Sequence, residues 1–190
     1  METERSFSFG RAEVTTLAPS AAPALRRLYL VRFGFAVVWA ILLTSTGADL
    51  NPVSVGLLVL YPVFDVAAAV VDLRSSRTST LAVNAAVSAL AAVGLAVAAA
   101  AGVPAVLRVW GAWAIVSGLV QLVVGVRRRA LGGQVPMMLA GGISVLAGAS
   151  FAAMAGADDP AVAGVAGYAA VGGVFFLVSA LRLGRAARGN

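Results

Sequence analysis

The chain has 190 residues, of which 61% are hydrophobic and only 12% are charged, and its mean hydropathy is +0.95. Soluble domains are about half apolar and about a quarter charged, so this composition excludes an ordinary soluble domain and indicates an integral membrane protein. The chain contains no cysteine and no histidine. That composition excludes disulfides, thiolate or imidazole metal sites and Ser-His-Asp triads.

Six apolar runs are long enough to cross a bilayer, which needs about 20 residues of helix. They are apolar on every side rather than alternating, which favours helices over the strands of a membrane barrel. Prolines open four of the runs, and Asn51 and Asp159 precede two of these prolines as N-caps. In chain order we expect spans over residues 28–45, 52–71, 79–101, 104–126, 136–155 and 160–181.

The arginines predict an orientation. All but one of the fourteen basic residues fall in the N-terminal segment or at span ends that share one side of the membrane, whereas Arg108 and the loop residue Asp49 lie on the other. The positive-inside rule then predicts a multi-pass protein of the bacterial cytoplasmic membrane with both termini in the cytoplasm. This distribution argues against a nucleic-acid-binding surface. We therefore expect the lipid bilayer, and no nucleic acid, as a partner.

Two regions follow from this pattern. Residues 1–25 are polar and predict a disordered cytoplasmic tail, and residues 26–190 predict a six-helix transmembrane domain. Three segments align without gaps and each ends in an arginine, namely residues 61–74, 114–127 and 169–182. The fold class we expect is therefore all-α, an integral membrane bundle of six transmembrane helices built from three parallel two-helix hairpin repeats. The repeats cover about residues 28–77, 78–129 and 135–185.

Small residues recur along the fourth and fifth spans. Gly111, Gly118 and Gly125 stand at heptad spacing, and Ser144 and Gly148 belong to a stripe at four-residue spacing. Membrane helices associate through small residues, because lipid removes the hydrophobic drive for packing. Two interpretations stay open: the stripes close the bundle, or they form a contact with another copy of the chain or another membrane protein.

Two motifs combine a mid-helix glycine with small and aliphatic neighbours: Trp-Ala-Ile-Val-Ser-Gly-Leu-Val-Gln at residues 113–121, and Leu-Ala-Gly-Gly-Ile-Ser-Val-Leu-Ala-Gly at residues 139–148. With the repeated two-helix units, they resemble the HdeD-like family of small six-span bacterial membrane proteins over residues 26–188. The first hairpin departs from the pattern, because Asp65 stands where the other copies have glycine. The resemblance implies a role in envelope or acid-stress tolerance and carries over no catalytic residues.

Intramembrane polar side chains form the candidate site, because a central carboxylate costs about 2.5–3.5 kcal/mol to insert. Asp65 lies roughly 10 Å inside the cytoplasmic end of its span, and Asn84 and Gln121 fall at similar depth. Arg32 can reach the same level, and two further residues lie on the Asp65 face of the second span. The predicted polar layer comprises Asp65, Asn84, Gln121, Arg32, Tyr61 and Asp72.

Two hypotheses for Asp65 stay open. It is either a proton-titrating site or ion ligand, or a structural clamp bound to Asn84 or Arg32. On the outer side, Arg108 is expected to reach the headgroups or to meet a loop carboxylate such as Asp49. The three tryptophans are expected to form a belt at the outer interface, at positions 39, 110 and 113.

The function we expect is not enzymatic. The glycine pairs do not follow strands as a phosphate-binding loop would, and we expect no catalytic residue, no metal and no cofactor. The first hypothesis is a membrane protein of the HdeD-like kind that acts in envelope or acid-stress tolerance. The alternatives are a small transporter or channel for protons or small solutes that uses the polar layer around Asp65, and an accessory subunit of a larger membrane complex.

Overall fold

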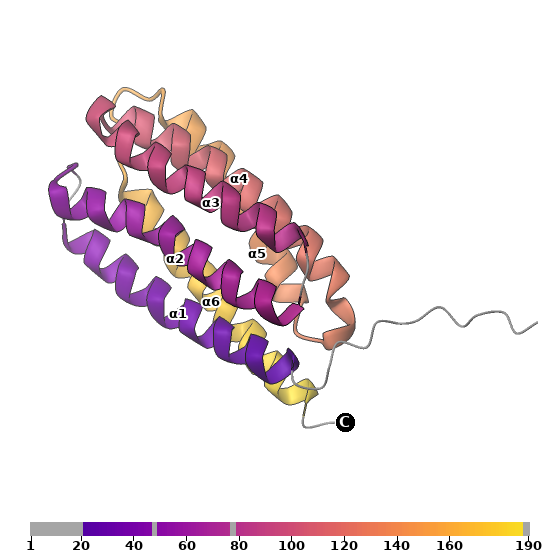
Figure 1. Ribbon diagram of the computed structural model, residues 1–190. Helices are drawn as coiled ribbons and strands as arrows, with labels where there is room; N and C mark the ends of the chain where they lie inside the picture. Colours follow the sequence, from indigo (N-terminus) through magenta and orange to yellow (C-terminus); the bar gives the residue numbers. More distant parts are fainter. Residues whose placement is uncertain (1–20, 47–48, 77–78, 188–190) are drawn as a thin grey trace, which may run out of the picture.

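The computed structural model describes residues 21–46, 49–76 and 79–187. Within these ranges the chain forms six long helices and two short 3-10 turns, and no strand (Figure 1). The long helices are α1 (Ala21–Ser45), α2 (Pro52–Ser76), α3 (Ser79–Ala98), α4 (Val103–Arg127), α5 (Val135–Met154) and α6 (Ala163–Ala186). The turns are η1 (Ala99–Ala101), which extends α3, and η2 (Arg129–Leu131), which follows α4.

The exterior of the bundle is apolar. All six helices are long and apolar enough to cross a membrane, and large aliphatic side chains cover their outer faces. Leu90 and Leu146 are each 73% exposed and Val97 is 71% exposed, which would be costly in water and is favourable in lipid. The all-helical six-span fold class is confirmed, and the chain is a multi-pass membrane protein.

Two predicted boundaries are wrong. Residues 21–25, assigned to the tail, belong to α1, because Leu25 and Tyr29 are buried in one cluster with residues of α6. Residues 1–20 lie outside the described residues, so the predicted disorder there stays a prediction. At the other end of the chain, α6 begins at Ala163 and not at Pro160, so Asp159 is no N-cap. Val162, almost fully buried in the core, precedes the helix instead.

The start of α2 is capped as expected. The Asn51 side chain accepts hydrogen bonds from the backbone N–H groups of Val53 and Ser54, both at 3.0 Å. In return, the Ser54 hydroxyl accepts a bond from the backbone N–H of Asn51 at 2.9 Å. This reciprocal pair satisfies backbone donors that the start of a helix leaves without partners, so α2 begins sharply at Pro52.

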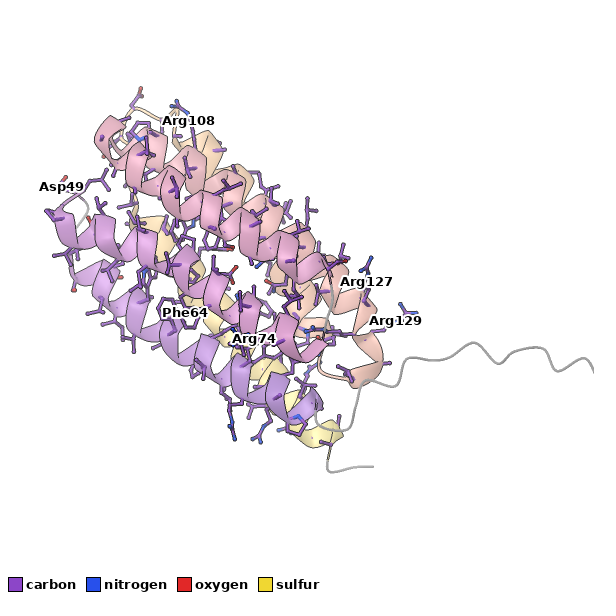
Figure 2. All side chains as sticks on the ribbon, in the orientation of Figure 1. Asp49, Phe64, Arg74, Arg108, Arg127 and Arg129 are labelled. Carbon is purple, nitrogen blue, oxygen red and sulfur yellow. The ribbon has the colours of Figure 1, made fainter. Side chains whose placement is uncertain are left out.

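The helices pack as a ring in chain order. Contacts are most extensive between α1 and α6, between α2 and α3, and between α4 and α5. They are sparser between the two helices of each predicted hairpin, which are α1–α2, α3–α4 and α5–α6. Three like hairpins set side by side would give this alternation, although the repeat itself stays a prediction. Antiparallel neighbours gather Arg74, Arg127 and Arg129 at one end, called the basic end here, and Asp49 and Arg108 at the other (Figure 2).

Glycines bring α4 and α5 into backbone contact. A Cβ added to Gly118 would lie 2.6 Å from the Gly141 carbonyl oxygen, and one added to Gly148 would lie 2.5 Å from that of Gly111. These positions therefore tolerate no side chain without a shift of the backbone. The small-residue stripes therefore pack α4 against α5 and close the bundle, which is the first of the two interpretations. An additional contact with another copy or another membrane protein stays a prediction.

Neighbouring glycines of α5 provide a direct test of this packing. We expect Gly141→Ala to lower the free energy of unfolding by about 1–3 kcal/mol, because its Cβ would lie 2.7 Å from the Gly118 carbonyl oxygen. Gly142→Ala should cost nothing, since no atom in the described part of the chain lies within 4 Å of its added Cβ. Unfolding of both variants in mixed detergent micelles measures the difference, and equal stabilities would contradict the close α4–α5 contact.

The predicted tryptophan belt is wrong. Trp39, Trp110 and Trp113 are 1%, 0% and 6% exposed and lie inside the bundle. Trp39 and Trp110 stack with ring centroids 5.7 Å apart, and Tyr61 meets all three rings edge-on. The Trp39 indole N–H also donates to the Leu57 carbonyl at 2.6 Å, so the polar edge of the ring finds its partner inside the protein rather than at the headgroups.

Candidate functional site

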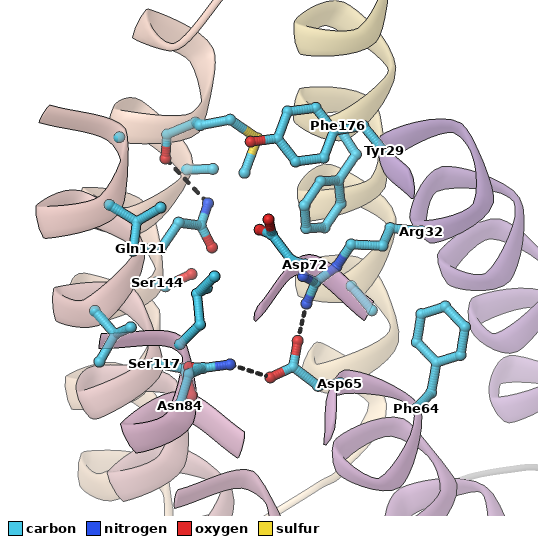
Figure 3. A pocket seen from close by; sticks show the side chains of 18 of the residues that line it. Tyr29, Arg32, Phe64, Asp65, Asp72, Asn84, Ser117, Gln121, Ser144 and Phe176 are labelled. Atoms are coloured by element: carbon cyan, nitrogen blue, oxygen red, sulfur yellow. Dashed lines mark hydrogen bonds and ion pairs between the residues drawn. The ribbon is translucent and has the colours of Figure 1, made fainter. Parts of the chain in front are cut away.

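A polar cavity of about 100 Å³ lies inside the ring of helices. Every long helix contributes to its wall, and the linker between α4 and α5 adds Arg128 and Gln134 toward the basic end. The aromatic cluster around Tyr61 and Trp113 borders it on the other side. All six residues of the predicted polar layer line this one space, and Figure 3 shows Arg32, Asp65, Asp72, Asn84 and Gln121 there.

The Asp65 carboxylate binds three other side chains. One carboxylate oxygen forms an ion pair with Arg32. The other accepts hydrogen bonds from the Asn84 amide at 2.7 Å and from the Ser88 hydroxyl at 2.8 Å. Arg32 and Asn84 approach the carboxylate from different helices (Figure 3). Both partners considered for a structural clamp are therefore engaged at once.

The helix periodicity explains why these groups meet. Asn84 and Ser88 are four residues apart on α3 and so lie on one face, which is turned toward Asp65 on α2. The Trp113 indole N–H donates to the Ser88 hydroxyl at 3.0 Å and extends the network to α4. Arg32 also lies over the Phe176 ring, 4.7 Å from its centroid, a cation–π contact that offsets part of the cost of burying its charge.

A second ion pair lies nearer the basic end. The Arg128 guanidinium binds both carboxylate oxygens of Asp72, at 2.7 and 2.8 Å, in the two-pronged geometry that makes such pairs strong. Both side chains are buried. Burial acts to lower the pKa of Arg128, but the hydrogen bonds and the charge of Asp72 outweigh it, so the net effect raises this pKa above its ordinary value.

The raised pKa of Arg128 predicts how the stability of the protein depends on pH. A base whose pKa is raised by folding contributes stability that is fully present below its ordinary pKa and is lost only as the pH rises through the folded value. For Arg128, the ordinary pKa and the pKa in the folded protein both lie above the pH range of an unfolding experiment. We therefore expect the stability difference between wild type and Arg128→Met to stay constant from about pH 7 to 10. A steady decline over this range in unfolding titrations would contradict the buried pair.

The remaining predicted polar residue of α4 has a different partner. The Gln121 amide nitrogen donates to the Met137 carbonyl at 3.0 Å, so it bridges α4 and α5 rather than joining the Asp65 network. Gln134 enters the wall because Gly132 and Gly133 adopt positive φ angles of 72° and 64°, which other residues rarely adopt. Tyr29 donates to the Gln134 side chain in a long bond of 3.4 Å.

Arg108 lies apart from the cavity. It is exposed at the end opposite the basic end (Figure 2), and no ion pair joins it to Asp49 or Asp158 within the described part of the chain. Of its two expected positions, the structure is consistent with the headgroup level. It lines no part of the polar cavity.

Several residues of the site were missed from the sequence. Ser88 could have been found, because it lies one helical turn from Asn84 on the same face. Arg128 carries no such signal, since it stands between two other arginines, the last residue of α4 and the first residue of η2. Ser144 was assigned only to the packing stripe, but its hydroxyl lies 2.8 Å from that of Tyr168 beside the cavity.

The described residues contain no group of three or more acidic, cysteine or histidine side chains that could hold a metal ion. Comparison of the chain with family models, with curated proteins and with solved structures finds no match. The resemblance to the HdeD-like family therefore stays a prediction, and the function is argued from the cavity alone.

Proposed function

We propose that this protein binds small solutes in its polar cavity and passes them across the bilayer, as a small transporter or channel without enzymatic activity. In this proposal the basic end faces the cytoplasm of a bacterial cell, since arginines are retained on that side, and both termini are cytoplasmic. The observation that carries the proposal is a cavity of about 100 Å³ lined by charged and polar groups from all around the ring.

The contrast with the α4–α5 interface supports this reading. Where the bundle only needs to pack, glycines bring the backbones to within contact of each other. Around the cavity, by contrast, the chain buries two ion pairs and several amides and hydroxyls and leaves space between them. Intramembrane charges are costly, and they are typically kept where they line a path for a solute or ion.

A cavity-filling variant tests the proposal. Gly172 lines the cavity, and an added Cβ there meets no atom of the described residues within 4 Å, so Gly172→Leu should fill the space without disturbing the fold. Gly167 lies on the same helix, is exposed and is equally free of neighbours, and Gly167→Leu is the matched control. In proteoliposomes we expect Gly172→Leu to lower the flux of small solutes or protons by about tenfold or more.

The control variant should retain the wild-type flux. Wild-type vesicles that are no more permeable than protein-free vesicles would overturn the proposal. Equal fluxes through wild type and Gly172→Leu would also overturn it, because the solute would then pass outside the cavity.

A second candidate is a non-enzymatic protein of the HdeD-like kind that acts in envelope or acid-stress tolerance without passing solutes. The full set of partners around Asp65 favours it, because a carboxylate held by an arginine, an amide and a hydroxyl suits a structural clamp. Acid survival of a deletion strain complemented with Gly172→Leu separates the two, since only this candidate expects full rescue. An accessory subunit would instead co-purify with its partner stoichiometrically in mild detergent.

A further inference from the structure

The charges that line the polar cavity cancel. Arg32 pairs with Asp65, and Arg128 pairs with Asp72 through two short hydrogen bonds. An ion that entered would either have to break one of these pairs or remain without a counter-charge in a low-dielectric space, and both are costly. The wall therefore disfavours anions and cations alike.

The wall of the cavity also contains polar groups that make no hydrogen bond with the described residues. Gln121 uses its amide nitrogen for the Met137 carbonyl, and its oxygen makes no hydrogen bond with any described residue. Ser117 lies one turn away on the same face of α4 and lines the cavity too. Its hydroxyl is buried without a partner in the described part of the chain. Buried polar groups of this kind are normally satisfied by a ligand or water.

The size of the space limits the occupant. A cavity of about 150 Å³ takes a benzene molecule, whereas this one measures about 100 Å³. The occupant is therefore no larger than benzene. It must offer both donors and acceptors, since the free groups of the wall include an amide oxygen and a hydroxyl.

We infer that the solute is small, uncharged and rich in hydrogen-bonding groups, of the chemical class of urea and the simplest amides. This inference rests on the proposed function, because it names what the proposed path admits. The neutral charge balance of the wall selects against ions, and the free groups on α4 bind the amide in place of water.

The test compares three planar solutes with the same number of non-hydrogen atoms and different charge: urea, guanidinium and nitrate. Their initial uptake rates are measured in proteoliposomes of the full chain, with Gly172→Leu as the baseline and Gly167→Leu as the control. Above that baseline, we expect urea to enter at least about tenfold faster than either ion. Ser117→Ala, whose hydroxyl has no partner to lose among the described residues, should slow urea severalfold and leave the fold intact.

The outcomes separate this inference from the proposed function. If guanidinium or nitrate enters through wild type and is blocked by Gly172→Leu while urea is not transported, the solute class is wrong and the transport proposal stands. If none of the three exceeds the Gly172→Leu baseline and protons also do not, both fail. Urea uptake that Ser117→Ala and Gln121→Leu leave unchanged would overturn the assignment of the α4 groups.

Discussion

Asp65→Asn is expected to lower the free energy of unfolding by about 3–5 kcal/mol, because it leaves the Arg32 charge buried without its carboxylate. From the sequence alone, an exchange of carboxylate for amide could have passed as mild, since a hydrogen bond to Asn84 remains. The structure changes that expectation, since the second oxygen of Asp65 is paired with Arg32 and the two side chains are only 7% and 18% exposed. Unfolding in mixed detergent micelles measures the loss.

A double-mutant cycle isolates the ion pair. Arg32→Gln combined with Asp65→Asn removes both charges and leaves groups that can hydrogen-bond, so we expect the double variant to be more stable than Asp65→Asn alone. Asp49→Asn, at an exposed position just before α2, is the control and should be neutral. A double variant as unstable as the sum of the two single variants would mean that Arg32 and Asp65 are not energetically coupled.

Arg128→Met should destabilise the protein by about 3–5 kcal/mol, while Arg129→Met changes stability by less than about 0.5 kcal/mol. Arg128 is buried and binds both oxygens of Asp72, whereas the adjacent Arg129 is exposed. The two variants remove the same charge from neighbouring positions, so a difference between them reports the buried pair rather than the charge of the basic end. Equal effects in the same unfolding assay would contradict the bidentate contact.

The spans and the depth of the polar residues could be predicted from the sequence, because a bilayer imposes a fixed helix length. The predicted depth in the membrane placed Arg32, Asp65 and Asn84 at one level. In the structure Asp65 binds both of the other side chains. Helix rotation could not be predicted in the same way, because it depends on packing between helices.

Rotation accounts for the principal errors. Trp39 was placed at the interface because tryptophan is common there, but α1 turns it inward to the Leu57 carbonyl. Arg128 was grouped with its neighbours as a topological signal, but its position beyond the last turn of α4 turns it back toward Asp72. Gln121 lies at the expected depth, but it faces α5 rather than the Asp65 network.

If the polar cavity holds water and solute, a thiol placed inside it should be accessible to a reagent from solution. The chain has no native cysteine, so Gly172→Cys places a single thiol in the cavity, and Val174→Cys places one on the exposed, lipid-facing side of the same helix. Thiols react as thiolates, which form only where water reaches them. We expect Gly172→Cys to react with a small, uncharged amide reagent such as chloroacetamide and Val174→Cys, whose thiol lies in lipid and does not ionise, to stay unmodified. An unreactive Gly172→Cys in a folded protein would contradict a cavity that holds water and solute.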